Sequence, residues 1–283
     1  MTLSSQIATI TSPARPESAE IDGRVLLTGD DYQVILTGDP QQILQVQRLR
    51  YQIFRAEAGY SADIGDPVTG LEADSFDAHC EHLLVRDRAT GAVTGCARVL
   101  PPPRAIAAGG WYAAGEFDLD ELDPIRAQTV ELGRLVVDPG HRSGTVVALL
   151  WAALLQYLSE GGYRYLMGCV SIPLNGDGPR GTELRGVRDI ARNRYAAPWQ
   201  VYPHRKVTVD GAGLDALEPP TADRIPPLLR AYLRLGARVC GEPALDEAFD
   251  VGDLLVVLDR ELADERYVAR LRSAAQRLSG KTN

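Results

Sequence analysis

The sequence has few cysteines, no long apolar run and no excess of positive charge. Its four cysteines are scattered and form no C-x-x-C pair, so reduced thiols fit better than a disulfide framework. No run approaches the roughly 18 apolar residues of a membrane-spanning helix, and no secretory signal is evident. The net charge of −8 argues against nonspecific nucleic-acid binding. These absences favour a cytoplasmic protein with no nucleic-acid partner.

The pattern of apolar residues predicts one domain that follows a tail. Residues 1–28 are rich in Ser, Thr, Pro and Ala and are predicted to be a flexible tail, and residues 29–283 form the domain, with a C-terminal extension from about residue 210. Helical periodicity is clearest at 145–158, and Asp39 and Pro40 are a plausible N-cap and first turn of an earlier helix. Strand-like runs occur at residues 32–38, 81–100, 130–137, 163–173 and 253–259. This order predicts an α/β (α+β) fold with a mixed sheet flanked by helices.

Two charged residues, Glu131 and Arg134, lie inside the apolar run at 130–137. Residues three apart on a regular strand face opposite sides, which would leave one charge buried without a partner, at a high cost in free energy. Gly133 separates them, and a glycine inside a strand often marks a bulge. We therefore predict a bulge that places Glu131 and Arg134 on one face and aims an unpaired backbone N–H at the same spot.

The turn DPGHRSG, residues 138–144, leads from this strand into the helix at 145–158. A helix N-terminus preceded by glycines can bind an anion. A plain connection between strand and helix is the alternative, because a strong phosphate-binding loop would have more glycines.

The strand, turn and helix together resemble the acyl-donor-binding core of the GNAT N-acyltransferase fold. The most similar branches are the ornithine-lipid N-acyltransferases, often labelled hemolysin-like, and the acyl-homoserine-lactone autoinducer synthases. The resemblance covers roughly residues 32–270 and implies a central mixed, mostly antiparallel sheet with helices on both faces. The matching residues are Arg50 and Phe54 in RYQIF, Asp74 and Asp77 in EADSFD, Arg98 in CARVL, and Glu131 and Arg134 in the central strand.

The resemblance implies transfer of a long-chain fatty acyl group, with or without a 3-hydroxyl, from a thioester to the α-amine of an amino acid. Ornithine is the favoured acceptor, and the product would be a lyso-ornithine lipid. Synthesis of N-acyl amino acids or acyl-homoserine lactones is one alternative. A non-catalytic GNAT fold that binds acyl groups or a carrier protein is another.

The donor is expected to be an acyl-phosphopantetheine thioester on acyl-carrier protein rather than acyl-coenzyme A. The turn lacks the fuller Q/R-x-x-G-x-G/A that holds the pyrophosphate of coenzyme A in this family, and a carrier protein presents only the pantetheine arm. Tyr60 also departs from the family, since autoinducer synthases carry a Trp nearby. The expected donor-binding residues are Val136, Val137, Arg142, Ser143 and Gly144. No permanently bound cofactor and no metal are expected.

The resemblance also suggests roles for the matching residues. Glu131 would act as general base, the N–H at Gly133 as oxyanion donor and Arg134 as carboxylate clamp. Asp74 and Asp77 would bind the cationic end of the acceptor, near Phe54. Alternatively, Arg50 and Arg98 pair with these two acids in an ion network that orders the loop at 59–73.

A basic segment at residues 180–206 would dock the acidic carrier protein, although a solvated helix face is the alternative. Its basic residues are Arg180, Arg185, Arg188, Arg192, Arg194, Arg205 and Lys206. The amphipathic helix at the C-terminus packs on the sheet or contacts the inner membrane face peripherally, since a lipid product must leave.

Overall fold

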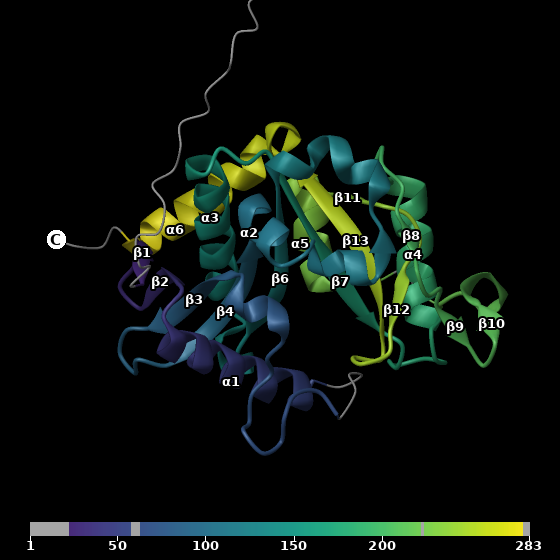
Figure 1. Ribbon diagram of the computed structural model, residues 1–283, viewed down its shortest axis with the longest axis horizontal. Coiled ribbons are helices and arrows are strands. Elements are labelled where there is room, and N and C mark those ends of the chain that lie inside the picture. The colour runs from purple at the N-terminus through teal and green to yellow at the C-terminus, as the bar shows by residue number, and fades with distance from the viewer. Residues whose placement is uncertain (1–22, 58–62, 222–223, 280–283) are drawn as a thin grey trace, which may run out of the picture.

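The structure, a computed structural model, describes residues 23–57, 63–221 and 224–279. Its centre is a nine-stranded sheet in the order β1-β2-β3-β4-β6-β7-β13-β11, with β12 paired to β13 (Figure 1). Only β6 and β7 pair in parallel, so the predicted mixed and mostly antiparallel sheet is confirmed. The strands are β1 (Arg24–Thr28), β2 (Tyr32–Thr37), β3 (Glu81–Asp87), β4 (Val93–Leu100), β6 (Thr129–Val137), β7 (Tyr165–Pro173), β11 (Arg238–Val239), β12 (Ala244–Asp246) and β13 (Val251–Asp259).

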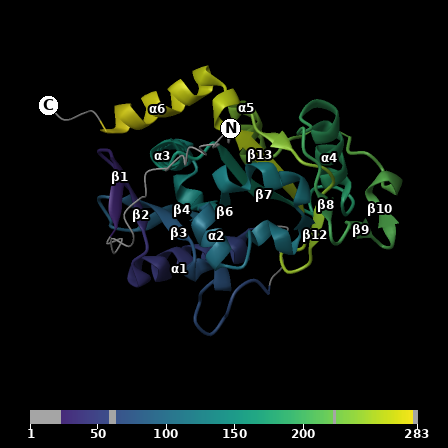
Figure 2. The same ribbon diagram turned by 45° about the horizontal axis from the view of Figure 1, so that its top comes forward.

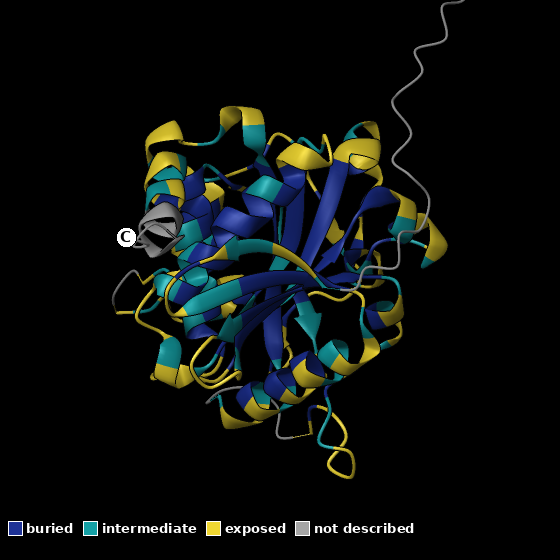
Figure 3. Cartoon of the chain, turned by 90° about the vertical axis from the view of Figure 1, so that its left-hand side faces the viewer, coloured by how far each residue is buried: buried dark blue, intermediate teal, exposed yellow. Residues whose placement is uncertain are grey.

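Helices cover both faces of this sheet, as predicted (Figure 2). One face packs on α3, with α4, α5 and α6 around it, and the other packs on α1 and α2. The strands and α3 form the buried centre, while the outer helices expose their far sides (Figure 3). The helices are α1 (Pro40–Ala56), α2 (Pro102–Ala107), α3 (Thr145–Glu160), α4 (Thr182–Arg194), α5 (Pro227–Leu235) and α6 (Glu265–Ser279). Among the described helices, none combines the length and apolar character needed to cross a bilayer.

The starts of α1 and α3 follow from local sequence. Asp39 caps α1 by accepting a hydrogen bond from the backbone N–H of Gln42, and Pro40 occupies the first turn, as predicted. Before α3, Gly144 adopts the left-handed φ of 95° and provides no side-chain cap. The first backbone N–H groups of α3 therefore have no side-chain acceptor at the N-cap position.

The predicted tail is wrong at its C-terminal end. Arg24–Thr28 form β1, which pairs antiparallel with β2, and Leu26 and Leu27 pack against the core. Apolar side chains that pack on the core from the sheet edge thus outweigh the Ser- and Pro-rich composition of the preceding residues. Residues 1–22 of the predicted tail, like Tyr60, lie outside the described residues. The segment from about residue 210 is part of the sheet, since β13 pairs with β7 along nine residues.

Candidate active site

The predicted bulge in β6 is present. Cys96 pairs with Val136 and Arg98 with Gly133, so two residues of β6 lie opposite one residue of β4. The left-handed conformation falls on Arg134, with φ of 50°, rather than on Gly133. Such a conformation in a non-glycine residue costs on the order of 1–3 kcal/mol and recurs at functional sites. The extra residue places Arg134 and Glu131 in the same cavity, as predicted.

That cavity opens where β6 and β7 diverge. The two strands pair only between Thr129–Glu131 and Tyr165–Met167. At the divergence, a Cβ on Gly168 would lie 2.4 Å from the carbonyl oxygen of Leu132, so the close approach of the strands requires glycine. The cavity holds about 920 Å³ of empty space, counting the part open to solvent.

Glu131 is 5% exposed and does not pair with Arg134. Its two carboxylate oxygens accept hydrogen bonds from the backbone N–H groups of Tyr112, at 2.7 Å, and Ala113, at 2.8 Å. Burial raises the pKa of Glu131 to about 7, although these N–H groups and the charges of Arg98 and Arg134 oppose the rise. A carboxylate with this pKa can accept a proton near neutral pH.

Arg50 is fully buried and anchors an ion network beside the cavity. Its two terminal nitrogens bond both oxygens of Asp77, at 2.9 and 2.6 Å. Its Nε lies 2.5 Å from a carboxylate oxygen of Glu72. Burial raises the pKa of Asp77, but the hydrogen bonds and charge of Arg50 outweigh it and hold that pKa well below its usual range.

Two further arginines close this network into a ring. Arg98 contacts Asp77 at 3.1 Å and Asp74 at 2.5 Å. Arg134 contacts Asp74 at 3.2 Å and Glu72 at 3.0 Å. Positive and negative groups therefore alternate around six members: Arg50, Asp77, Arg98, Asp74, Arg134 and Glu72.

The ring confirms the predicted ion pairs of Arg50 and Arg98 with Asp74 and Asp77. The sequence did not reveal Glu72 as a member, and Arg134 was assigned to substrate alone. Of the predicted substrate-binding residues, Phe54 and Arg98 line the cavity with Arg134. The side chains of Arg50, Asp74 and Asp77 lie outside its described lining.

A second group of acids was missed by sequence reasoning. Glu116, Asp246 and Asp253 each bring a carboxylate oxygen within 4.8 Å of the others, and we call them the acidic trio. Asp246 and Asp253 line the cavity. They come from segments far apart in the chain, and acids in loops resemble ordinary solvated charge. Of the three, only Asp253 could have been noticed in the sequence, because it is a charged residue at the start of the apolar run at 253–259.

The predicted donor residues surround the start of α3. Val136 and Val137 are buried on opposite faces of the sheet, whereas Arg142, Ser143 and Gly144 are exposed. Arg142 donates to both carboxylate oxygens of Glu57, at 3.2 and 2.8 Å, and to the carbonyl of Val137. Its charge is therefore already matched by a carboxylate.

The basic segment is less positive than its composition indicated. Arg188 is 2% exposed and pairs with Asp189, Asp215 and Glu242, so its predicted docking role is wrong. A buried arginine serves here to join α4 to the neighbouring loops. Arg180, Arg185 and Arg205 also pair with acids, namely Asp250, Asp189 and Glu247. In the described part of the chain, Arg194 and Lys206 are exposed without an ion pair. Arg192 is also exposed and makes one long contact, 3.8 Å from its Nη1 to a carboxylate oxygen of Glu242.

Comparison with known proteins agrees with this geometry. Residues 49–152 match the model of the acetyltransferase (GNAT) domain. The chain is 32% identical over 246 residues to an L-ornithine N(α)-acyltransferase of Brucella abortus, covering 83% of this chain and 86% of that protein. The chain belongs to the L-ornithine N(α)-acyltransferase family. A relative of that name from Rhodobacter capsulatus is 30% identical, with 83% of this chain and 93% of that protein covered.

Among solved structures, BjaI, a coenzyme A-dependent acyl-homoserine lactone synthase determined with SAM and isopentyl-CoA, has a TM-score of 0.50. It is 16% identical, and the match covers 83% of each chain. This likeness shows the fold. Family and fold together make the protein a GNAT-type acyltransferase, as the sequence indicated.

Proposed function

We propose that this enzyme transfers a long-chain fatty acyl group from acyl-carrier protein to the α-amine of ornithine, giving a lyso-ornithine lipid. The observation that carries the chemistry is Glu131, which is buried at the β6 bulge in an open cavity with a pKa of about 7. The acceptor follows from the relatives named L-ornithine N(α)-acyltransferase. The enzyme would work in the cytoplasm and release its lipid at the inner membrane face.

The reaction needs a neutral amine, because an ammonium has no lone pair for attack. Glu131 takes the proton, and the freed amine attacks the thioester carbonyl carbon. A backbone N–H at the bulge stabilises the oxyanion of the tetrahedral intermediate. The C–S bond then breaks as the carbonyl re-forms, and the second proton that the attacking nitrogen must lose goes to the departing pantetheine sulfur. Arg134, which lines the cavity, is placed to attract the acceptor carboxylate.

The turn before α3 favours a carrier-protein donor over coenzyme A. Arg142 is bound to Glu57, so this side chain offers no unmatched charge to a pyrophosphate, and the Glu57 carboxylate would repel one. A pantetheine arm lacks that group. We therefore expect kcat/KM with acyl-carrier protein to exceed kcat/KM with the matching acyl-coenzyme A.

Mass spectrometry of products tests the function. The pure protein is incubated with long-chain acyl-carrier protein and a panel of amines, and we expect N(α)-acylornithine. Acyl-homoserine lactone or another acyl amino acid as the main product would favour a signal synthase. Tight carrier binding without any product would favour a non-catalytic binding module.

Docking of the carrier protein is predicted to use the exposed end of α4. Replacing Arg192 and Arg194 together with Glu should raise the apparent KM for acyl-carrier protein about 10-fold at low salt, because steering by charge is lost. The difference should shrink as salt screens the charges.

The matched control changes Arg266 and Arg270 to Glu on α6, which lies away from α4 (Figures 1 and 2). These substitutions make the same change in net charge and should leave the KM for carrier protein unaltered. If the two pairs have equal effects, or if the α4 pair has none, Arg192 and Arg194 do not dock the carrier protein and belong to an ordinary solvated helix face.

A further inference from the structure

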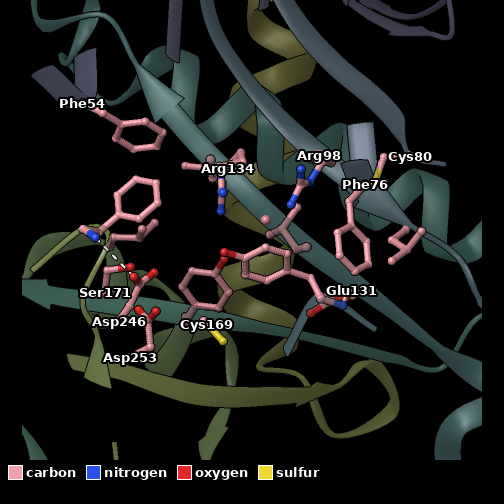
Figure 4. A pocket seen from close by; sticks show the side chains of 18 residues that line it. Phe54, Phe76, Cys80, Arg98, Glu131, Arg134, Cys169, Ser171, Asp246 and Asp253 are labelled. Carbon is pink, nitrogen blue, oxygen red and sulfur yellow. Dashed lines mark hydrogen bonds between the residues drawn. The ribbon is translucent and has the colours of Figure 1, made fainter. Parts of the chain in front are cut away.

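The acidic trio lies on the side of the cavity opposite Glu131. Figure 4 shows Asp246 and Asp253 grouped with Ser171, while Glu131 lies at the other side and Cys169 between them. Asp246 ends β12, Asp253 lies in β13, and Glu116 follows the 3₁₀ turn Tyr112–Gly115. Neither the ion ring nor the role of Glu131 as general base involves these three acids.

The trio contains an unsatisfied buried acceptor. Asp253 is 3% exposed, lines the cavity, and its Oδ1 has no hydrogen-bond partner. Asp246 uses Oδ1 to accept from the backbone N–H groups of Ala248 and Phe249, at 2.8 and 3.2 Å. None of the three acids forms an ion pair with a basic side chain in the described part of the chain. A buried oxygen that lacks a donor is costly unless a ligand supplies one.

The electrostatics of the trio suit a cation, because without one its carboxyl groups retain protons. Burial raises the pKa of Glu116 and of Asp253, and each is raised further by the charge of Asp246. Three carboxyl groups this close cannot all ionise without a positive partner, because like charges in a buried site repel strongly. A bound cation would let them ionise and would donate to the open Oδ1.

The shape and lining of the cavity favour an organic ammonium over a divalent metal. Tyr112, Tyr232 and Phe249 line the same cavity, and aromatic faces attract ammonium groups. Calcium and magnesium require about six or more oxygen ligands, of which this group offers few. The cavity also holds Glu131 for an amine, on the side opposite Asp246 and Asp253, and Arg134 for a carboxylate (Figure 4).

We propose that Asp253, together with Asp246 and Glu116, binds the side-chain ammonium of the acceptor and selects basic amino acids. This subsite rests on the proposed acylation of ornithine and assigns residues to its δ-ammonium. It replaces the expectation that Asp74 and Asp77 take that group, since neither lines the cavity. The three anchor points hold one acceptor, with its α-amine at Glu131, its carboxylate at Arg134 and its side chain at the trio.

The test compares ornithine with norvaline, which has the same carbon chain without the δ-amine. In the wild type, ornithine should be favoured. Asp253→Asn should raise the KM for ornithine about 10–100-fold, as expected for loss of a charged hydrogen bond. It should change kcat for ornithine far less and leave kcat/KM for norvaline within about twofold. Asp246→Asn should act in the same direction, and the exposed Asp177→Asn should have no effect.

Binding of free ornithine and norvaline, measured by calorimetry, reads the subsite without turnover. Weaker binding of ornithine alone to Asp253→Asn supports the subsite even if another donor or product were found. Equal loss for both amino acids, or no change, overturns it. Activity that EDTA abolishes and Mg²⁺ or Ca²⁺ restores would also overturn it in favour of a metal. The thermal midpoint of Asp253→Asn should hold or rise, since a repelling carboxylate is removed, whereas a structural role predicts a fall.

Discussion

Replacement of Glu131 with Gln should lower turnover by about 10²–10⁴-fold, the usual contribution of a general base. The amide keeps the size of the side chain but takes no proton from the amine. Its single carbonyl oxygen can keep only one of the two N–H bonds that the carboxylate accepts on separate oxygens. The KM for ornithine should change little. Steady-state kinetics with acyl-carrier protein measure both values. Glu81→Gln is the matched control, since Glu81 is equally buried and bonds Tyr157 outside the cavity.

The pH profile gives an independent check on Glu131. Because burial raises its pKa to about 7, the carboxylate is protonated and inactive as a base below that pH. The wild-type kcat/KM should therefore rise with pH through about 7. For Glu131→Gln, the residual kcat/KM should not rise through pH 7. It should rise only at the higher pH at which the substrate amine itself loses its proton. Near-normal turnover in the variant, or an unchanged profile, would remove Glu131 from the role of base.

Replacement of Arg50 with Met should lower the free energy of unfolding by about 3–5 kcal/mol, because it leaves Asp77 and Glu72 as buried charges that lose their main partner. At about 2–4 °C per kcal/mol, the thermal midpoint should fall by roughly 6–20 °C. Arg142→Met removes an exposed ion pair with Glu57 and should cost less than about 1 kcal/mol. Calorimetry of both variants measures the difference, and equal small losses would show that the ring contributes little.

The effect of Arg50→Met should also depend on pH. The folded-state pKa of Asp77 is below its unfolded value, so the ring's contribution through Asp77 is fully present above about pH 4. As the pH falls toward the folded pKa, Asp77 binds a proton and that contribution is lost. The stability gap between wild type and variant should therefore narrow in acid.

The features that the sequence predicted correctly are local, or they involve charged residues at positions where an apolar residue is expected. Two charges and a glycine in an apolar strand were enough to predict the β6 bulge and a shared site for Glu131 and Arg134. The pairing of Arg50 and Arg98 with Asp74 and Asp77 followed from the resemblance. The left-handed φ could not be assigned to Arg134, because sequence favours glycine for that conformation.

What escaped prediction depends on contacts between distant segments. Asp253 and Glu116 are 137 positions apart in the chain, and Glu116 follows the turn whose N–H groups Glu131 binds. The sequence gives no sign that Arg188 is buried, because the acids that pair with it come from three segments of the chain. Composition alone also misplaced β1, whose pairing with β2 is decided by tertiary packing.

The position of β13 has a consequence for folding during synthesis. β7 pairs with β6 at only three positions, whereas it pairs with β13 at nine. Until residues 251–259 leave the ribosome, most of β7 presents unpaired backbone groups along an apolar strand, a template for wrong association. The last strand to be made thus pairs the open side of β7 and, in the same step, delivers Asp253 to the cavity. A chain cut short before it would leave most of β7 unpaired on that side and would lack one wall of its site.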